Sequence, residues 1–478
     1  MKRYYLLLTI LLIFGCSQIP VNIDMKYWTI MVYASADCNL EPYLLTDVEE
    51  LKRGTKNNVN IVVLMDRSVT YSEDASVFGE NFSDTRLYQV LSNNCFRLDG
   101  EAEFPEITRS SNYEANLGDP NTLKKFINFC KAQYPADNYA LVMGGHGDGT
   151  RSLSSGETSR AISYDENDSF GNSDMLYTGE ITDNLTSKES VNLLVLDACL
   201  MGTIEVAYQF RPNIDKFGSD YLVASPPNIW ARGLNYDAIL SKIGYSGSGS
   251  ISPVVLNPVD FGKIIINEQT KVFEKYSDYT LKQALSLFDL SKVVAVKASI
   301  DDLSKSIYSY KTETIGIRDS AYDSNLIAYF NLYSGEWQNW AYFDLYDLCE
   351  KIGNNAVFSV YSQKVSTALN NIDEFVVASY AGDYFSNFNF KTGKNGVSIF
   401  FPNGEAIING TLSWSEQLWY NAIHTQDVFG SGDHYGALDW CADGATSGNN
   451  IVENWFELLD SFFDETNDAT GGVNGYQY

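Results

Sequence analysis

Short hydrophobic runs alternate with amphipathic stretches along the first half of the chain. Four runs are almost wholly apolar: 28–33, 60–65, 139–143 and 191–196. Such runs are typical of strands that are buried on both faces of a sheet. After residues 40 and 119, hydrophobic side chains recur at spacings of three and four, as on one face of a helix. The alternation predicts an α/β fold with a mostly parallel central sheet and helices on both faces.

The remaining pattern is less regular. It predicts strands at 84–91, 375–380 and 396–401, and helices at 200–210, 258–276 and 290–308. Residues 148–190 are rich in Ser, Gly, Asp and Asn, and we interpret them as an exposed insertion. After Asn395 the sequence contains no Lys or Arg, and its last part mixes acids with aromatic side chains. We therefore expect C-terminal α/β elements followed by an acidic tail.

The N-terminus has the pattern of a targeting signal. Lys2 and Arg3 precede a short apolar run, Leu6–Phe14, that is too short for a comfortable bilayer span. Cys16 follows at a position that resembles a bacterial lipobox, in which the Cys is acylated and becomes the first mature residue. An ordinary signal peptide in which Cys16 is incidental is the alternative. We expect an exported, membrane-anchored bacterial lipoprotein, in the periplasm or on the cell surface.

Charge narrows the classes of partner. The chain has 61 Asp and Glu against 33 Lys and Arg, a formal net charge of −28. A phosphate backbone would be repelled, which excludes nucleic-acid binding. An anionic membrane would be repelled as well, so any attachment must be hydrophobic or covalent. With 45% hydrophobic and 20% charged residues, the chain is also unlike a disordered protein.

Two predicted strands end in residues that can carry chemistry. The strand at 139–143 leads into Gly-Gly-His-Gly, with His146, and the strand at 191–196 leads into Asp-Ala-Cys, with Cys199. The carboxyl ends of parallel strands meet at one edge of a sheet, so we expect these two side chains to be neighbours. A thiolate is a nucleophile, and a nearby His favours it and protonates a leaving group.

The flanking residues extend this hypothesis. Cys199 begins a predicted helix, whose N-terminal amides would stabilise a thiolate. Gly147 lets backbone approach closely, and its N–H together with that of Cys199 is a candidate oxyanion hole. Asp197 lies two residues before the thiol on the same strand face and could bind a cationic substrate side chain. Taken singly, each residue also fits a structural role, such as a core thiol or an ordinary loop.

Taken together, the motifs resemble the clostripain family of cysteine peptidases. The matching segments are WTIMVYASADCNLE, DPNTLKKFINF, YALVMGGHGDG, LLVLDACLMGTIEVAY, YLVASPPN, FDLYDLCEKI and NGVSIFFPNG, in family order over about residues 27 to 405. The resemblance implies a caspase-like α/β/α fold and a His–Cys dyad at His146 and Cys199. In this clan the His chiefly protonates the leaving amine. It also implies protein or peptide substrates cut after Arg or Lys, with Asp197 as the specificity acid.

The sequence departs from the family pattern at two places. Pro226 and Pro227 follow the Ala-Ser of YLVASPPN, where the family usually carries a further acid, so Asp197 would act with less help. Gly145 stands before the His, where the family usually has a polar residue.

The resemblance and the composition suggest five parts. They are a signal peptide at 1–15, a lipidated linker at 16–26, a caspase-like catalytic core at 27–245 with the insertion at 148–190, a C-terminal α/β part of the peptidase unit at 246–430, and an acidic aromatic tail at 431–478.

Relatives are activated by cutting their own chain between the His and the Cys, after a basic residue. Here that interval contains three basic residues, Arg151, Arg160 and Lys188. Arg151 is close to His146, and Lys188 adjoins a strand. Arg160 lies in a flexible Ser/Gly/Thr-rich stretch that favours cleavage. We expect a cut at Arg160–Ala161, with an uncut chain as the alternative.

No metal site is predicted, and calcium is the one cofactor that the sequence leaves open. Some relatives need it, and acids such as Asp165, Glu166 and Asp168 occur in the insertion. No twelve-residue calcium loop is present, and solvated loop acids are the simpler interpretation.

The function expected is an active lipid-anchored endopeptidase. The alternatives are a catalytically silent binding lipoprotein on the same fold and a structural adhesin. Neither function requires both His146 and Cys199, so the presence of both residues argues against these alternatives.

Overall fold

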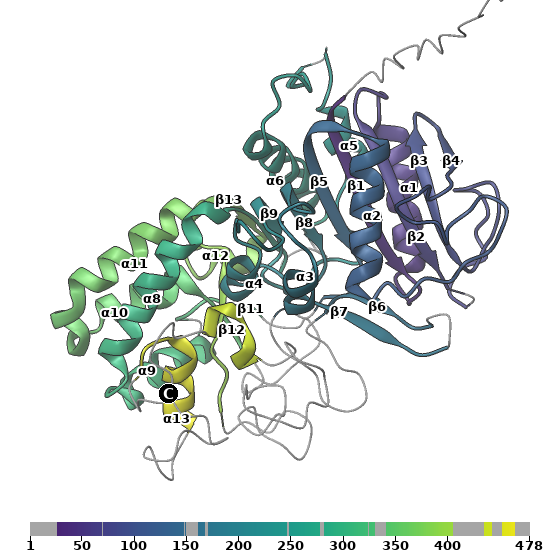
Figure 1. The fold of residues 1–478 in the computed structure, drawn as a ribbon. Coiled ribbons are helices and arrows are strands. Elements are labelled where there is room, and N and C mark those ends of the chain that lie inside the picture. Colours follow the sequence, from purple (N-terminus) through teal and green to yellow (C-terminus); the bar gives the residue numbers. More distant parts are fainter. Residues whose placement is uncertain are drawn as a thin grey trace, which may run out of the picture.

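The computed structural model describes residues 26–68, 70–147, 149, 161–167, 171–245, 248–277, 282–323, 325–329, 341–404, 435–441 and 452–463. Cys16, Arg160 and Asp168, which carry the expected lipidation, self-cleavage and one of the calcium ligands, lie outside these residues. The described part contains a nine-stranded sheet with helices on both faces and a smaller three-stranded sheet (Figure 1).

The predicted strands and helices are present close to their predicted positions, and the structure contains further elements that the sequence pattern did not predict. The strands are β1 Lys26–Ala36, β2 Asn60–Arg67, β3 Thr85–Leu91, β4 Asn94–Arg97, β5 Ala136–Gly144, β6 Ala161–Asp165, β7 Asp174–Tyr177, β8 Val191–Asp197, β9 Ser219–Ala224, β10 Ala284–Asp289, β11 Ala328–Tyr329, β12 Tyr342–Asp344, β13 Val376–Ala381 and β14 Ser398–Phe400. The longer helices are α1 Glu41–Gly54, α2 Pro120–Gln133, α6 Pro258–Lys275, α8 Val293–Ile307, α9 Lys311–Asp319, α10 Leu345–Asn354, α11 Ser362–Phe375 and α13 Trp455–Phe463. Shorter helices are α3 Thr178–Asn184, α4 Ile204–Gln209, α5 Tyr236–Ser241 and α12 Asp383–Ser386.

The large sheet has the order β13-β10-β9-β8-β5-β1-β2-β3-β4. The five strands from β9 to β2 run parallel, and the strands added at both edges run antiparallel. The expectation of a mostly parallel central sheet is therefore confirmed. Helices α8, α10 and α11 gather beyond the β13 edge (Figure 1).

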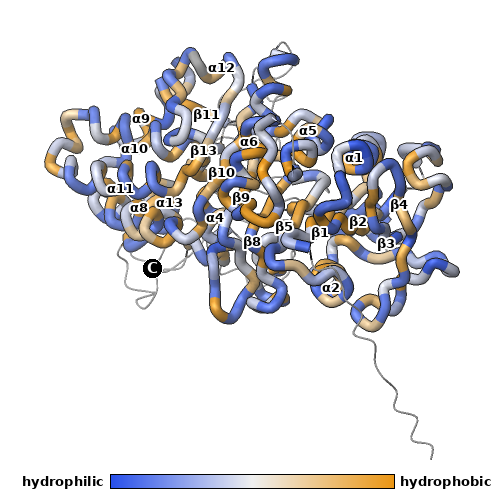
Figure 2. Tube along the Cα trace, turned by 90° about the horizontal axis from the view of Figure 1, so that it is seen from above, coloured by the Kyte–Doolittle hydropathy of each residue, from blue (hydrophilic) through white to orange (hydrophobic). Residues whose placement is uncertain are grey.

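The apolar runs are explained by two hydrophobic cores, one on each face of the sheet. Alternate side chains of β1 enter different cores: Met31 and Tyr33 pack with α2, whereas Ile30 and Val32 pack with α1 and α6. A strand that is buried on both faces needs no polar side, so the sequence shows a continuous run instead of alternation. Figure 2 shows this hydrophobic band along the central strands.

The predicted insertion is partly structured. Its described residues form an antiparallel hairpin, β6 with β7, followed directly by α3. The Ser163 hydroxyl is hydrogen-bonded to that of Ser35 in β1, which holds the hairpin against the carboxyl edge of the sheet.

Asp344 connects two segments of the second half of the chain by hydrogen bonds. It caps α10 by accepting from the Asp347 N–H at 2.9 Å, and it also accepts from the Asn395 side chain at 2.6 Å and the Gly396 N–H at 2.8 Å. These hydrogen bonds join the FDLYDLCEKI and NGVSIFFPNG segments in the fold. They also place β14 so that the Ser398 N–H donates to the Gly202 carbonyl at 3.0 Å.

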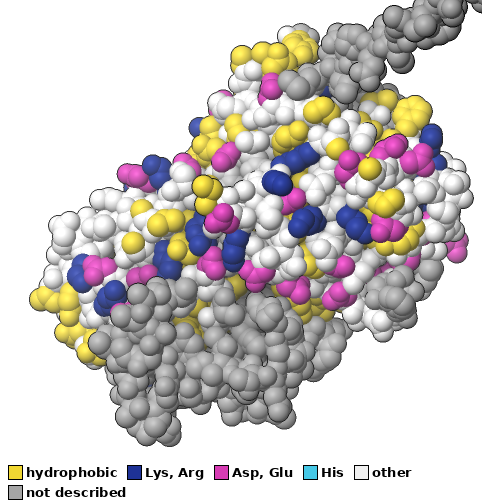
Figure 3. Space-filling model, in the orientation of Figure 1, with side chains coloured by type: hydrophobic (Ala, Val, Ile, Leu, Met, Phe, Trp, Pro, Cys, Tyr) yellow, Lys and Arg dark blue, Asp and Glu magenta, His cyan; other side chains and the backbone are white. Residues whose placement is uncertain are grey.

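The described parts of the expected acidic tail pack against the body of the protein. Trp440 is fully buried, and the Trp455 indole donates to the Phe400 carbonyl at 2.8 Å. The Tyr435 hydroxyl donates to Glu205 at 3.1 Å, and burial raises the pKa of Glu205 to about 7. On the face drawn in Figure 3, Lys and Arg side chains are interspersed with Asp and Glu.

Candidate active site

The register between β5 and β8 brings the two candidate loops together. Gly144, the last residue of β5, pairs directly with Asp197, the last residue of β8. His146 and Cys199 each follow two residues later. Because the strands are parallel, both loops leave the sheet side by side at its carboxyl edge.

The two loops are in direct main-chain contact. A Cβ atom placed on Gly147 would lie 2.7 Å from the Cys199 carbonyl oxygen, 2.8 Å from the Ala198 Cβ and 3.1 Å from the Cys199 nitrogen. A Cβ on Gly149 would lie 2.7 Å from the Leu200 carbonyl oxygen. Only residues without a side chain fit here, so the glycines after His146 let the loops close on each other.

His146 is half-buried and held by an asparagine. Its Nε2 lies 2.7 Å from the Asn39 Oδ1, and its ring meets that of Tyr164 edge-on at 6.5 Å between centroids. An amide oxygen only accepts, so the pairing requires a proton on Nε2. Asn39 lies in the turn between β1 and α1. In the sequence, Asn39 is only one residue of a motif, because no nearby residue indicates a partner more than a hundred positions away.

The helix predicted to begin at Cys199 does not do so. Leu200 has a left-handed backbone with φ of 61°, and α4 begins only at Ile204, with Thr203 as its cap. The Leu200 N–H donates to the Pro227 carbonyl at 3.0 Å, and the Gly202 N–H donates to the Ser225 carbonyl at 2.8 Å. The chain thus follows the neighbouring segment before it turns into the helix.

The later start of α4 contradicts the expectation that helix N-terminal amides stabilise a thiolate at Cys199. The amides of α4 are separated from Cys199 by Leu200–Thr203, so they do not stabilise a thiolate at Cys199. The thiol itself is half-buried, with Sγ 3.8 Å from the Ile229 carbonyl oxygen. Leu200 is a non-glycine residue in a strained conformation directly after the candidate nucleophile, as is common at functional sites.

Asp197 lies below the loops in a buried acidic site. Its side chain is 7% exposed, and Oδ2 accepts from the Tyr236 hydroxyl at 2.7 Å and the Leu234 N–H at 3.2 Å. Burial raises the pKa of Asp197, and the two hydrogen bonds oppose this shift.

A second acid, Asp47 of α1, belongs to the same site. A Cβ on Gly233, whose φ is 66°, would lie 3.0 Å from Asp197 Oδ2 and 3.5 Å from both Asp47 carboxylate oxygens. Asp47 is 6% exposed, and its buried Oδ1 has no hydrogen-bond partner among the described residues. Burial raises the pKa of Asp47 well above its usual range, and the charges of Asp197 and Glu50 add to this.

Sequence analysis missed Asp47 although a signal was present. On α1 it lies between Leu44 and Val48, within the hydrophobic face that predicted the helix. An acid on the buried face of a helix is costly unless something compensates it, and such a residue is therefore a candidate for function.

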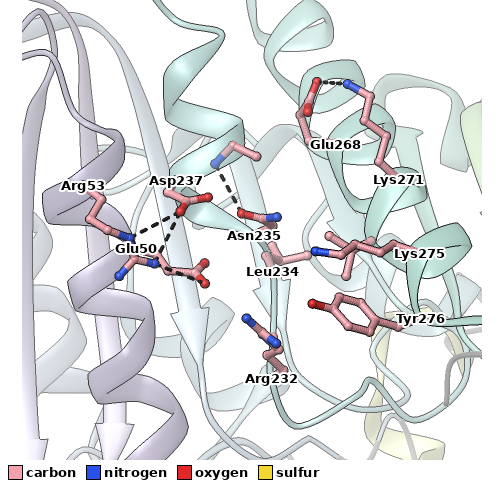
Figure 4. A pocket seen from close by; sticks show the side chains of 13 residues that line it. Glu50, Arg53, Arg232, Leu234, Asn235, Asp237, Glu268, Lys271, Lys275 and Tyr276 are labelled. Atoms are coloured by element: carbon pink, nitrogen blue, oxygen red, sulfur yellow. Dashed lines mark hydrogen bonds and ion pairs between the residues drawn. The ribbon is translucent and has the colours of Figure 1, made fainter.

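A separate pocket with a volume of about 350 Å³ opens beside the segment Arg232–Ala238 (Figure 4). Neither His146 nor Cys199 lines it. Arg53 lies between Glu50 and Asp237, 3.6 Å and 3.3 Å from their oxygens, so these charges are already compensated. The pocket adjoins the acidic site through the backbone of Gly233 and Leu234 but is not the place where His146 and Cys199 meet.

Comparisons with known proteins give a consistent result. A model of the clostripain family of peptidases matches residues 32–455, which extends beyond the last motif identified in the sequence. Clostripain from Hathewaya histolytica is 46% identical over 477 residues, covering 94% of this chain and 89% of that protein.

Two solved structures have the same fold. A secreted C11 cysteine protease from Bacteroides thetaiotaomicron, in complex with an irreversible peptide inhibitor, aligns with a TM-score of 0.54 and 18% identity over 87% of this chain and 99% of its own. An inactive zymogen C11 protease from Parabacteroides distasonis aligns with a TM-score of 0.53 and 18% identity over 79% of this chain and 92% of its own.

The contact between the loops predicts the effect of one methyl group. Gly147→Ala should lower the rate of peptide hydrolysis by about a hundredfold, because displacing the Cys199 backbone by about 1 Å misaligns reacting groups. The thermal unfolding midpoint should change little. Gly316→Ala, where a Cβ meets nothing within 4 Å, is the matched control and should keep wild-type activity. Wild-type activity in Gly147→Ala would show that the loops do not need this close approach.

Proposed function

Because this chain belongs to the clostripain family, it is a cysteine endopeptidase, and we propose that it is an exported, lipid-anchored enzyme that cuts peptide bonds after Arg or Lys. Cys199 is the nucleophile and His146 the proton donor. The observation that carries these roles is the main-chain contact of Gly147 with Ala198 and Cys199, which joins the two loops. The non-enzymatic alternatives, a binding lipoprotein and an adhesin, are set aside.

In the proposed reaction, the Cys199 thiolate attacks the carbonyl carbon of the scissile bond. The N–H groups of Gly147 and Cys199 stabilise the negative oxygen that forms. The C–N bond then breaks, and His146 gives the leaving amine the proton that its Nδ1 took from the Cys199 thiol. The Nε2 proton stays with Asn39. Water hydrolyses the resulting thioester, which releases the new carboxyl end and restores the thiol. Asn39 positions His146 through the 2.7 Å hydrogen bond to Nε2.

The acidic site accounts for the preference for basic residues. Asp197 and Asp47 are buried, and each raises the cost of charging the other in the absence of a cation. A guanidinium or ammonium group from the substrate supplies that cation. Among the described residues, the two hydrogen bonds that the Asp197 side chain accepts both end on Oδ2, and we assign Oδ1 to the substrate. Asp47 thus provides the second carboxylate that the sequence lacks at Pro226 and Pro227.

The two prolines have a different role here. The Pro227 carbonyl accepts from the Leu200 N–H and from the Ser225 hydroxyl, at 3.0 Å and 2.8 Å. Pro227 thus supports the loop that follows Cys199 through its carbonyl.

Export and anchoring rest on the N-terminal sequence. The lipobox-like Cys16 is the proposed site of acylation, and the C11 protease from Bacteroides thetaiotaomicron is described as secreted. No helix among the described residues combines the length and hydrophobicity that a membrane crossing needs. A covalent lipid would hold this acidic protein at a membrane whose surface charge repels it.

Self-processing at Arg160–Ala161 is part of the proposal. Ala161 is the first residue of β6, which pairs with β7, so a cut before it leaves the hairpin intact. The two fragments would stay together because they contribute neighbouring strands, β5 and β8, to one sheet. The related protein from Parabacteroides distasonis is described as an inactive zymogen, which fits activation by cleavage.

The dyad is tested with a fluorogenic peptide that carries Arg before the reporter. Cys199→Ala and His146→Ala should each lose roughly a thousandfold or more in kcat, because removing either member of a catalytic pair abolishes the shared step. Cys95→Ala, at a half-buried thiol on the edge strand β4, is the control and should remain active. Activity near wild type in either dyad variant would contradict the assignment.

Specificity is tested by comparing Arg, Lys and Leu peptides. Asp197→Asn and Asp47→Asn should each reduce kcat/KM for Arg and Lys peptides by roughly a hundredfold, as expected for breaking a buried ion pair at one partner. Asp99→Asn, at a half-buried acid that is paired with Arg109 and lies outside this site, is the control. An equal loss on all peptides would mean that the two acids support the loop and do not bind substrate.

The same acids predict a pH dependence. Their pKa values are raised, so they become protonated at a higher pH than an ordinary Asp, whose pKa is about 3.9. With falling pH, kcat/KM for Arg peptides should decline earlier than kcat/KM for Leu peptides.

Anchoring and processing are tested by intact mass spectrometry of protein extracted from membranes. Wild type should give two chains, one that begins with an acylated Cys16 and ends at Arg160, and one that begins at Ala161. Cys199→Ala should give one acylated chain, and Cys16→Ser should appear in the soluble fraction. A fully active protein that consists of one intact chain would rule out the proposed cut.

A further inference from the structure

The pocket beside the segment Arg232–Ala238 and the acidic site share one stretch of backbone. A Cβ on Gly233 would lie 3.0 Å from Asp197 Oδ2, and the same residue lines the pocket of about 350 Å³. Arg232, which directly precedes Gly233, lines the pocket as well. Consecutive Cα atoms are about 3.8 Å apart, so the Arg232 backbone lies within one residue of the wall of the acidic site. The pocket is therefore next to the place proposed for the basic side chain of the substrate.

The charges that line this pocket leave positive charge in excess. Each acid of the lining is held by a cation of the same lining, in the pairs Glu50–Arg53, Asp237–Arg53 and Glu268–Lys271 (Figure 4). Arg232 and Lys275 form no ion pair among the described residues. Four cations thus face three acids in the lining, although the net charge of the whole chain is −28.

The two cations without an ion pair converge on Tyr276. The Lys275 Nζ lies 4.9 Å and the guanidinium carbon of Arg232 5.6 Å from the centre of the Tyr276 ring. In Figure 4 both side chains and the Tyr276 hydroxyl point towards the inside of the pocket. Lys275, by a hydrogen bond and by its charge, and then Arg232 lower the pKa of Tyr276. A lowered pKa of a phenol means that negative charge on its oxygen is favoured there.

We propose that Arg232 and Lys275, together with the Tyr276 hydroxyl, form a subsite for an acidic side chain of the substrate, among the residues that precede the Arg or Lys bound at Asp197. A carboxylate in the pocket accepts charge-assisted hydrogen bonds from the guanidinium and ammonium groups. This subsite rests on the proposed function, because it requires a peptide whose basic side chain occupies the acidic site.

The proposed self-cleavage sequence contains such an acid. In Gly-Glu-Thr-Ser-Arg, Glu157 stands three residues before Arg160, and Asp148 has the same spacing from Arg151. Lys188 has no acid among the four residues before it. An extended peptide advances about 3.3 Å per residue, so an acid with this spacing lies about 10 Å along the backbone from the basic residue. We therefore place the acid that the subsite binds three residues before the cleaved bond's Arg or Lys.

The test uses the full chain and fluorogenic peptides with Arg before the reporter, each carrying either Glu or Gln two, three or four residues before the Arg. At the third position, wild type should have a kcat/KM about fivefold higher for Glu than for Gln, as expected for a partly exposed ion pair. The variant with both Arg232→Gln and Lys275→Gln should lose this preference. Lys263→Gln, at an exposed lysine of α6 outside the pocket, is the control and should keep the wild-type ratio.

Charge reversal and salt test the electrostatic origin of the preference. A variant with both Arg232→Glu and Lys275→Glu should cut the Glu peptide more slowly than the Gln peptide, because like charges then meet in the pocket. Added salt should reduce the preference of wild type. Each comparison is a ratio between two peptides on the same protein, so a general loss of activity or folding in a variant cancels.

Two outcomes overturn the subsite while the proposed function stands. One is an Arg-specific wild type that cuts the Glu and Gln peptides equally at all three positions. The other is a preference for Glu that survives in the variant with both Arg232→Gln and Lys275→Gln. A wild type that cuts Arg and Leu peptides equally would instead contradict the proposed specificity, and the subsite with it.

Discussion

The arrangement of the candidate active site depends on close contact between two backbone segments. Gly144 and Asp197 are paired at the ends of two parallel neighbouring strands, and Gly147 lies against Ala198 and Cys199 with no side chain between them. The backbone contacts alone bring the His146 and Cys199 segments together. The register of the central sheet determines where the two loops start, and the absent Cβ atoms determine how closely they approach.

Buried negative charge is the second organising feature. Asp47 and Asp197 form one group, and Asp37, Asp66 and Asp165 form another. Burying such charges costs several kcal/mol per ion unless a partner is present. In the function proposed here, the substrate supplies the partner of the first group. The enzyme thus gives up stability for dependence on an incoming cation.

The sequence predicted what is encoded locally. Continuous apolar runs identified the central strands, and the ends of two of those strands identified His146 and Cys199. It could not identify Asn39, because the significance of this residue arises from a contact with a distant segment. Asp47 was missed although its place on the hydrophobic face of α1 was a signal. The helix predicted to begin at Cys199 was wrong for a related reason. The hydrophobic spacing after Leu200 is helical, but hydrogen bonds to Ser225 and Pro227 hold the first residues in another conformation.

The support for the segment after Cys199 also bears on how the enzyme is made. The Gly202 carbonyl accepts a hydrogen bond from Ser398, which lies 196 positions later, and Glu205 binds Phe400 and Tyr435. During translation the proposed nucleophile, Cys199, therefore leaves the ribosome long before these residues. The segment after Cys199 has all of these contacts only when nearly the whole chain has been synthesised. A chain that is still being synthesised lacks this support.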